Sequence, residues 1–386
     1  MTAALLPAWR GVRRLLAVRL DNLGDVLMTT PALAAVRQAL PHAHVTLLAS
    51  PAGAALQPHL PDVDEVAVFE APWVQSACTA EQAGPATAAL AARLAAGRFD
   101  AAIVFTVCTQ SALPMATVLL LAGIPLRLAH CRENPYHLLS DWVRDRDTPG
   151  DGLRHEVQRQ LDLVAAVGMA PPSAGWRGRP AAALRFVPQP GDGERLAARL
   201  RRAGVDPGAP YFVVHPGASA ASRRYPAARF AQAAQAVAEA GGGHAIVVGG
   251  AGEADLVEAA RPAAAPSTAL VGGLSLGELA ALIGGARVTL CNNSGPAHVA
   301  AALGAPVVVL YALTNPQHTP WLAPARVLSH EVPCRHCLRS VCPMGHHACL
   351  LGVPAGEVAA AAVQLMGAHP AAARREAGRP ACKESR

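Results

Sequence analysis

Residues Arg14–Leu20 read RLLAVRL, and the polar stretch Asp21-Asn22-Leu23-Gly24-Asp25 follows them directly. A short apolar run of this kind is typical of a buried parallel strand. We expect a loop at residues 21–25 and a helix at residues 26–40 behind it. Pro31 falls near the first turn of that helix, where proline is tolerated. A strand, a polar glycine loop and a helix in this order predict the first unit of an α/β fold.

The same alternation continues along the chain. We expect further strands at residues 45–48, 65–69, 101–105, 211–215, 244–248, 288–291 and 306–311, and helices at residues 83–96, 113–122, 153–167, 227–240, 253–260, 276–283 and 296–303. Proline and glycine cluster at residues 170–210, which indicates a linker. A chain of 386 residues also exceeds the size at which single cores stop growing. The sequence therefore predicts two doubly wound, mostly parallel sheets, whose ligands bind at the carboxyl ends of the strands.

The composition narrows the classes of partner. Hydrophobic residues make up 52% of the chain and charged residues 16%, which favours a large core and excludes a disordered chain. The net charge of +6 is partly carried by short arginine clusters, such as Arg223 and Arg224, which suit phosphorylated or anionic small molecules. Aromatic residues are only 4%, too few for the stacking that nucleic-acid binding uses, so we expect no nucleic-acid partner.

The start of the chain lacks the long apolar run and cleavage site of a signal peptide. The most apolar stretch, residues 116–124, has about half of the roughly 20 residues that a spanning helix needs. We expect a cytoplasmic protein, with peripheral contact at the inner face of the inner membrane. Nine cysteines in a reducing compartment indicate thiols or a metal rather than disulfides.

Three polar loops follow predicted strands. In the first, Asp25 is suited to act as a general base toward an acceptor hydroxyl, or else to cap the following helix. In the second, His215-Pro216-Gly217-Ala218-Ser219 precedes Arg223 and Arg224; a helix N-terminus and arginines bind a diphosphate, although an ordinary turn has the same composition. In the third, Asn292-Asn293-Ser294-Gly295-Pro296-Ala297-His298 offers hydrogen bonds for sugar hydroxyls, while His298 taken alone is typical of a structural histidine.

A cysteine cluster forms the fourth motif. Cys334, Cys337, Cys342 and Cys349 lie within 16 residues, a spacing that predicts either a structural Zn²⁺ or iron site or a reduced cluster without metal. Four protein ligands leave no open position, so a metal held there would not be catalytic.

Together these stretches resemble the ADP-heptose:lipopolysaccharide heptosyltransferases, glycosyltransferase family nine. The resemblance runs from about Arg14 to Met366. It rests on LAVRLDNLGDVLMTTPAL, HPGASAASRRYPAARF and CNNSGPAHVAAALGAPVVVLYALTNP, which occur in the family's order, and AGIPLRLAH and CRHCLRSVCPMGHHACL are also similar to members of the group.

The resemblance implies a GT-B fold of two Rossmann-like domains with a cleft between them: an acceptor domain at residues 13–180 and a nucleotide-sugar domain at residues 205–367. It implies an inverting transfer of heptose from ADP-heptose to a lipopolysaccharide inner-core acceptor, with no cofactor required for catalysis. Asp25 matches the general base. The expected substrate-binding residues are Asn22, Gly24, His215, Gly217, Ser219, Arg223, Arg224, Glu253, Asn293, Ser294, Gly295, His298 and Thr314.

Two departures from the family pattern bear on the substrate. The family often has lysine where Arg223 stands. Arginine carries the same positive charge, but its planar guanidinium differs in shape from the lysine ammonium group. The family usually has aspartate where Asn293 stands, which leaves the donor sugar open. Two other functions stay open. One is an iron-containing heptosyltransferase that modifies autotransporter proteins, because such proteins resemble this chain in their clustered cysteines. The other is a non-catalytic protein that binds a nucleotide-sugar, in which Asn293 would mark the decay of the sugar site.

Overall fold

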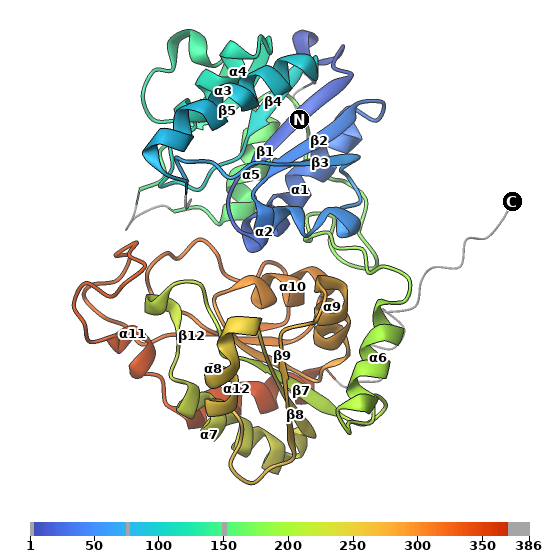
Figure 1. The fold of residues 1–386 in the computed structure, drawn as a ribbon, viewed down its shortest axis with the longest axis vertical. Helices are drawn as coiled ribbons and strands as arrows, with labels where there is room; N and C mark the ends of the chain where they lie inside the picture. The colour runs from blue at the N-terminus through green and yellow to red at the C-terminus, as the bar shows by residue number, and fades with distance from the viewer. Residues whose placement is uncertain (1–3, 75–77, 149–152, 370–386) are drawn as a thin grey trace, which may run out of the picture. The chain divides into compact units, whose positions relative to one another are not determined.

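The computed structural model describes residues 4–74, 78–148 and 153–369. The chain forms two compact units (Figure 1). The first consists of the residues up to Trp176 together with Pro180–Val187, and the second of Arg177–Arg179 and the residues from Pro188 onward.

The first unit is built on a six-stranded sheet in which every pairing is parallel. Its order is β3-β2-β1-β4-β5-β6. The strands are β1 (Arg14–Arg19), β2 (His44–Ala49), β3 (Glu65–Val68), β4 (Ala101–Val104), β5 (Leu126–Cys131) and β6 (Asp141–Arg144). Five of the six residues of β1 are buried, as expected for a central strand covered on both faces.

Helices cover both faces of this sheet. They are α1 (Leu23–Ala39), α2 (Pro51–Ala54), α3 (Ala80–Ala96), α4 (Leu113–Leu121) and α5 (Glu156–Ala165). Leu16 and Val18 of β1 share one core with α3 and α4, which lie together beside β4 and β5 in Figure 1. Helices α1 and α5 pack against each other.

The second unit repeats the arrangement. Its six strands are β7 (Tyr211–His215), β8 (His244–Gly249), β9 (Ser267–Val271), β10 (Thr289–Asn292), β11 (Val307–Leu310) and β12 (Ala325–Leu328). The order is β12-β11-β10-β7-β8-β9, again with parallel pairings throughout. Counted from its own first strand, each sheet therefore has the order 3-2-1-4-5-6 of the Rossmann fold.

The helices of the second unit are α6 (Asp192–Arg202), α7 (Ala227–Val237), α8 (Ala254–Ala259), α9 (Leu276–Gly285), α10 (Gly295–Leu303), α11 (Ala348–Leu351) and α12 (Ala355–Ala368). Helices α7 and α12 bury their apolar faces in one core, and α6 and α9 in another. Single turns occur at Pro7–Trp9, Gln57–His59, Tyr136–Leu138, Ala221–Arg223, Ala238–Gly242 and Ala251–Glu253. Among the described residues no helix is long and apolar enough to cross a membrane.

The predicted fold class is confirmed: the chain is α/β with two parallel, doubly wound sheets. Three local predictions were wrong. Residues 170–210 are not a plain linker, because α6 lies within them and buries Leu196 and Leu200. Helix α1 begins at Leu23, so the loop before it is shorter than expected. Four strands of the two sheets, β5, β6, β9 and β12, were not expected as strands.

In a sheet of this order, ligands bind where the chain switches direction, beside the carboxyl ends of its two central strands. Those ends belong to β1 and β4 in the first unit and to β7 and β10 in the second. All three polar loops predicted from the sequence follow one of these four strands.

Candidate active site

A buried arginine organises the carboxyl end of β1. The Arg19 side chain has no exposed surface, and it contacts three carboxylates. Its Nε lies 2.9 Å from Asp21 Oδ2, its Nη2 lies 3.3 Å from Asp25 Oδ1, and its Nη1 donates to Glu156 Oε1 at 2.8 Å. The pairs join the end of β1 to the first turns of α1 and α5. A buried guanidinium is tolerated only when such partners compensate for its lost hydration.

Asp25 is held from two directions. It is the third residue of α1, and its Oδ2 accepts the backbone N–H of Asn22 at 3.1 Å in a capping box. Its Oδ1 accepts from Arg19. The N-cap is therefore Asn22, which corrects the alternative that Asp25 itself caps the helix, and Gly24 is the buried second residue of α1. The Asp25 side chain remains 14% exposed, so the carboxylate is oriented but still reachable.

Asp21 occupies a more enclosed position on the same guanidinium. Its side chain is 9% exposed, and its Oδ1 accepts from Gln110 Nε2 at 2.5 Å. Burial raises the pKa of Asp21 to about 6; the neighbouring Asp25 and Glu156 carboxylates add to the rise, and Arg19 and Gln110 oppose it. The main cause is burial, which penalises the charged form of the carboxylate.

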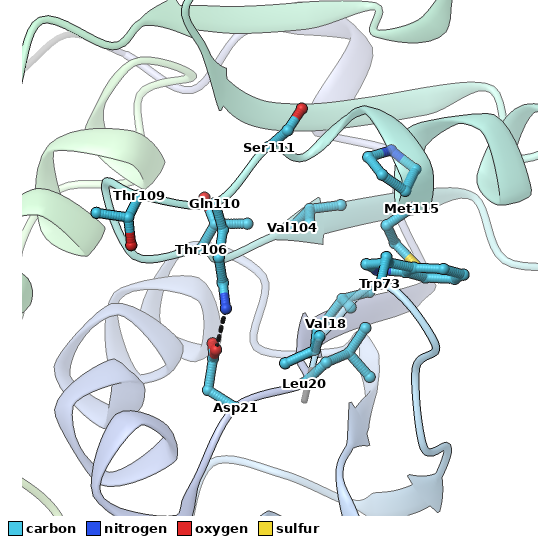
Figure 2. A pocket seen from close by; sticks show the side chains of 12 residues that line it. Val18, Leu20, Asp21, Trp73, Val104, Thr106, Thr109, Gln110, Ser111 and Met115 are labelled. Atoms are coloured by element: carbon cyan, nitrogen blue, oxygen red, sulfur yellow. Dashed lines mark hydrogen bonds between the residues drawn. The ribbon is translucent and has the colours of Figure 1, made fainter. Parts of the chain in front are cut away.

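A cavity of about 210 Å³ opens beside Asp21, between the carboxyl ends of β1 and β4. Figure 2 shows Val18, Leu20, Trp73 and Met115 on one side of it and Asp21, Thr106, Thr109 and Gln110 on the other. The remaining lining residues are Val74, Val104, Ser111 and Pro114. The cavity is smaller than the roughly 300–1,000 Å³ typical of drug-sized ligands, so it suits a single small ring. An aromatic face opposite hydrogen-bonding groups fits a sugar, whose C–H faces are apolar and whose edges carry hydroxyls.

A second charged network contacts the main chain of Thr106, which is one of the residues that line the cavity. The main-chain oxygen of Thr106 accepts from Arg159 Nε at 3.2 Å and from Gln160 at 3.1 Å. Arg159 is fully buried and pairs with Asp145 and Asp147 at 2.8 and 2.9 Å. These groups on α5 and after β6 fix the loop that follows β4. The sequence analysis did not single out Arg19, Gln110, Glu156 or Arg159.

In the second unit, Asn292 joins the two predicted loops. This fully buried side chain at the end of β10 donates to the oxygen of Pro216 at 2.7 Å. Its Oδ1 accepts the N–H of Tyr225 at 3.0 Å. The loop after β7, the start of α7 and the loop after β10 are thereby brought together, as predicted for ligand loops at adjacent strand ends.

His215, Gly217 and Glu253 form one corner of this region. A Cβ on Gly217 would lie 2.2 Å from Glu253 Oε1, so only glycine allows the carboxylate to pack there. Glu253 Oε2 also accepts the N–H of Gly250 at 2.8 Å, which gives it a structural role in the turn before α8. Burial lowers the pKa of His215, and the Glu253 carboxylate partly offsets this effect.

Arg223 is the best placed cation for an anionic ligand in this unit. Its Nε is buried and has no hydrogen-bond partner among the described residues. Tyr311, whose pKa burial raises, is close enough to interact with both Arg223 and Asn293. Ser219 and Arg224 are exposed, and Arg224 Nε donates to the oxygen of Ala218 at 2.8 Å.

The third loop leads into a helix N-terminus. Ser294 is the N-cap of α10, Gly295 is its first residue, and Ser294 Oγ donates to the oxygen of Asn292 at 3.3 Å. The Ser294 side chain does not cap this helix, and the dipole at a helix N-terminus suits an anion. His298 is the fourth residue of α10 and is buried, and Thr314 is buried in the segment after β11.

The cysteine cluster does not show the geometry of a metal centre. Cys334 Sγ lies 3.8 Å from His346 Nε2, and the pKa of Cys349 is raised by burial and by the three other thiols. In the part of the chain that the structure describes, no group of three or more His, Cys, Asp or Glu side chains is arranged to hold a metal ion. The described residues therefore give the predicted zinc or iron site no support.

Two Rossmann-type sheets of this order are the building plan of the GT-B fold, and solved structures of similar fold agree with it. A glycosyltransferase of family 9 from Veillonella parvula aligns over 92% of this chain and 98% of its own, with a TM-score of 0.74 and 20% identity. The ADP-heptose lipopolysaccharide heptosyltransferase II of E. coli aligns over 92% and 99%, with a TM-score of 0.68 and 23% identity.

The profile of "Glycosyltransferase family 9 (heptosyltransferase)" matches residues 87–348. The chain belongs to glycosyltransferase family 9, and it is a glycosyltransferase of the heptosyltransferase type. It is also 34% identical over 146 residues to "Lipopolysaccharide heptosyltransferase 1" of Pseudomonas aeruginosa. That match spans 37% of this chain and 41% of the length of the relative.

Replacing Arg19 with methionine should strongly destabilise the first unit. The change leaves Asp21, Asp25 and Glu156 without their cation, and breaking a buried pair costs about 3–5 kcal/mol. Urea unfolding followed by tryptophan fluorescence measures this, because Trp9, Trp73, Trp142 and Trp176 all lie in the first unit. The matched control in the same unit is Glu65→Gln, whose contact with His44 is exposed and should be worth about 0–1 kcal/mol. Equal effects of the two changes would contradict the central role of Arg19.

Replacing Asp21 with asparagine should change how stability depends on pH. The folded pKa of Asp21 is about 6, above the roughly 3.9 of an unfolded aspartate. The stabilisation from its protonated form is therefore complete below about pH 4 and lost as the pH rises through about 6. Asparagine cannot ionise, so the Tm of the variant minus that of the wild type should increase between pH 5 and pH 7.5. A constant difference would show that Asp21 titrates normally.

Proposed function

We propose that this chain transfers a heptose from ADP-heptose to a saccharide acceptor of lipopolysaccharide, with inversion at the anomeric carbon. Family membership supports the reaction class. The specific donor and acceptor are supported by the names of similar proteins, which are lipopolysaccharide heptosyltransferases. The observation that carries the proposal is Asp25, a fixed and reachable carboxylate at the end of β1, in the unit that also holds the sugar-sized cavity.

The first unit would bind the acceptor, within the predicted domain of residues 13–180. Asp25 would accept the proton of an acceptor hydroxyl as its oxygen attacks the anomeric carbon of the donor. Two contacts, from Asn22 N–H and Arg19, hold the carboxylate in one orientation and so reduce the entropy lost in reaching the transition state.

The second unit would bind the donor, within the predicted domain of residues 205–367. The bond between the anomeric carbon and the diphosphate breaks, and ADP leaves with its electron pair. Arg223 and the N-terminus of α10 would stabilise the charge that grows on the diphosphate. Asn293 and Ser294 would contact the sugar or nucleotide. Cytoplasmic location and contact with the inner membrane stay predictions.

Asp25→Asn should lower the transfer rate by about 10²–10⁴-fold, the usual contribution of a general base. The affinity for ADP should change little, because the proposed donor site is in the other unit. Release of ADP measures the rate, and calorimetry with ADP measures binding. Asp255→Asn, an exposed change on α8, is the control. Wild-type turnover in Asp25→Asn would remove this residue from the role of base.

Arg223→Met should weaken ADP binding by about 10–100-fold, since a charge-assisted contact to the diphosphate is lost. Adenosine, which lacks the diphosphate, should bind the variant as it binds the wild type. The exposed Arg326→Met is the matched control for a change in net charge. If adenosine and ADP lost affinity equally, Arg223 would act on the fold of the site rather than on the diphosphate.

A further inference from the structure

Four free thiols lie close together in the segment of residues 334–349. They are Cys334, Cys337, Cys342 and Cys349, and each is partly exposed. The Sγ atom of Cys334 lies 3.8 Å from His346 Nε2, and the other three thiols are close enough to Cys349 to interact with it electrostatically. The segment therefore presents several nucleophilic sulfur atoms that small reagents can reach.

The main chain of this segment holds the connection that follows β11. The N–H of His336 donates to the oxygen of Leu313 at 2.6 Å, and the N–H of Leu338 donates to the oxygen of Thr314 at 3.0 Å. Cys337 is the residue between these two donors. Because Thr314 is a predicted substrate-binding residue, its position depends on the backbone on either side of Cys337.

The same segment holds the turn that ends at Arg223. Ser222 is buried, and its N–H donates to the oxygen of Ser340 at 3.0 Å. Its Oγ donates to the oxygen of Arg339 at 2.8 Å. Arg223, the cation proposed to bind the diphosphate, is the next residue and the last of the turn. Residues 336–340 thus fix two parts of the proposed donor site through their main chain.

The backbone around Cys337 is also constrained. His336 and Leu338 have φ angles of 61° and 54°, in the left-handed region that residues with side chains disfavour. Such a conformation persists only where other contacts hold it, and these contacts include the hydrogen bonds to Leu313 and Thr314. A disulfide brings two sulfur atoms to about 2.05 Å and two Cα atoms to about 4.4–6.8 Å. This new constraint at Cys337 would compete with the hydrogen bonds.

We propose that residues 334–349 are a site of thiol oxidation, and that a disulfide between Cys337 and one of the three other thiols lowers the affinity of the second unit for nucleotides. The inference rests on the proposed function, because it takes Arg223 and Thr314 as parts of the donor site. It goes further by giving that site a regulation: the reduced segment holds both parts in place, and the oxidised segment releases them.

The oxidant is a low-molecular-weight disulfide of the glutathione type. One cysteine thiolate of the segment attacks a sulfur of this disulfide, which forms a mixed disulfide and releases one small thiol. A second cysteine attacks the protein sulfur of the mixed disulfide, and the other small thiol leaves. Two electrons and two protons thus pass from the protein to the oxidant, and a dithiol reductant reverses both steps.

Oxidised glutathione and ADP test the proposal on the full chain. Peptide mass spectrometry of the treated protein should find Cys337 in a disulfide within residues 334–349. In calorimetry the oxidised protein should bind ADP at least about tenfold more weakly than the reduced protein, and dithiothreitol should restore the affinity. Cys337→Ser should bind ADP as the reduced wild type does, whatever the treatment. The matched control is Cys78→Ser, a partly exposed thiol of the first unit, which should keep the sensitivity.

Hydrogen exchange gives a second readout that needs neither a variant nor a nucleotide. The N–H groups of Ser222, His336 and Leu338 donate the hydrogen bonds that hold the segment, so oxidation should speed their exchange and leave that of β7 unchanged. The proposal is overturned if Cys337 forms no disulfide, if exchange is the same in both states, if both states bind ADP equally, or if Cys337→Ser stays sensitive. Reduced wild-type protein that binds no ADP would reject the proposed donor, while the exchange rates would still show whether oxidation releases the segment.

Discussion

The first unit depends on one interaction, the burial of Arg19 among three carboxylates. The guanidinium sits where β1 ends, and its partners come from the loop after β1, the first turn of α1 and the first turn of α5. Because an unpaired buried charge is costly, these three elements must meet at one point. Pairing with Arg19 also places two acidic side chains at the switch point of the sheet. Asp25 is 14% exposed, and Asp21 is more enclosed.

In the second unit, a neutral side chain holds together the segments at the carboxyl ends of the central strands. Asn292 stands at the end of β10 and binds main-chain atoms at both ends of the connection between β7 and α7. An amide can donate and accept at once, so it fixes this connection without adding charge. In this unit the buried Nε of Arg223 has no hydrogen-bond partner among the described residues, whereas the buried guanidinium of Arg19 in the first unit contacts three carboxylates.

The sequence predicted the features that depend on local pattern. Apolar strands followed by polar glycine loops identified β1, β7 and β10, and the residues that end them, because strand ends in parallel sheets collect at one edge. The sequence did not predict contacts between residues that lie far apart in the chain. Nothing near Glu156 indicates that it pairs with Arg19, 137 residues earlier. The edge strands β6, β9 and β12 carry partly exposed residues and so lack the apolar run that marks a central strand. Helix α6 was not predicted, because the prolines and glycines on either side of it indicated a linker.

Asp25 has a structural role in the first turn of α1, and its role as general base stays a prediction. A side chain that completes a capping box has a structural function, and that function alone explains an acidic residue at this position of a helix. It does not explain why the same carboxylate also binds a buried arginine while remaining 14% exposed at the switch point. Capping and catalysis are therefore compatible, because the cap supplies the rigid orientation that a general base needs.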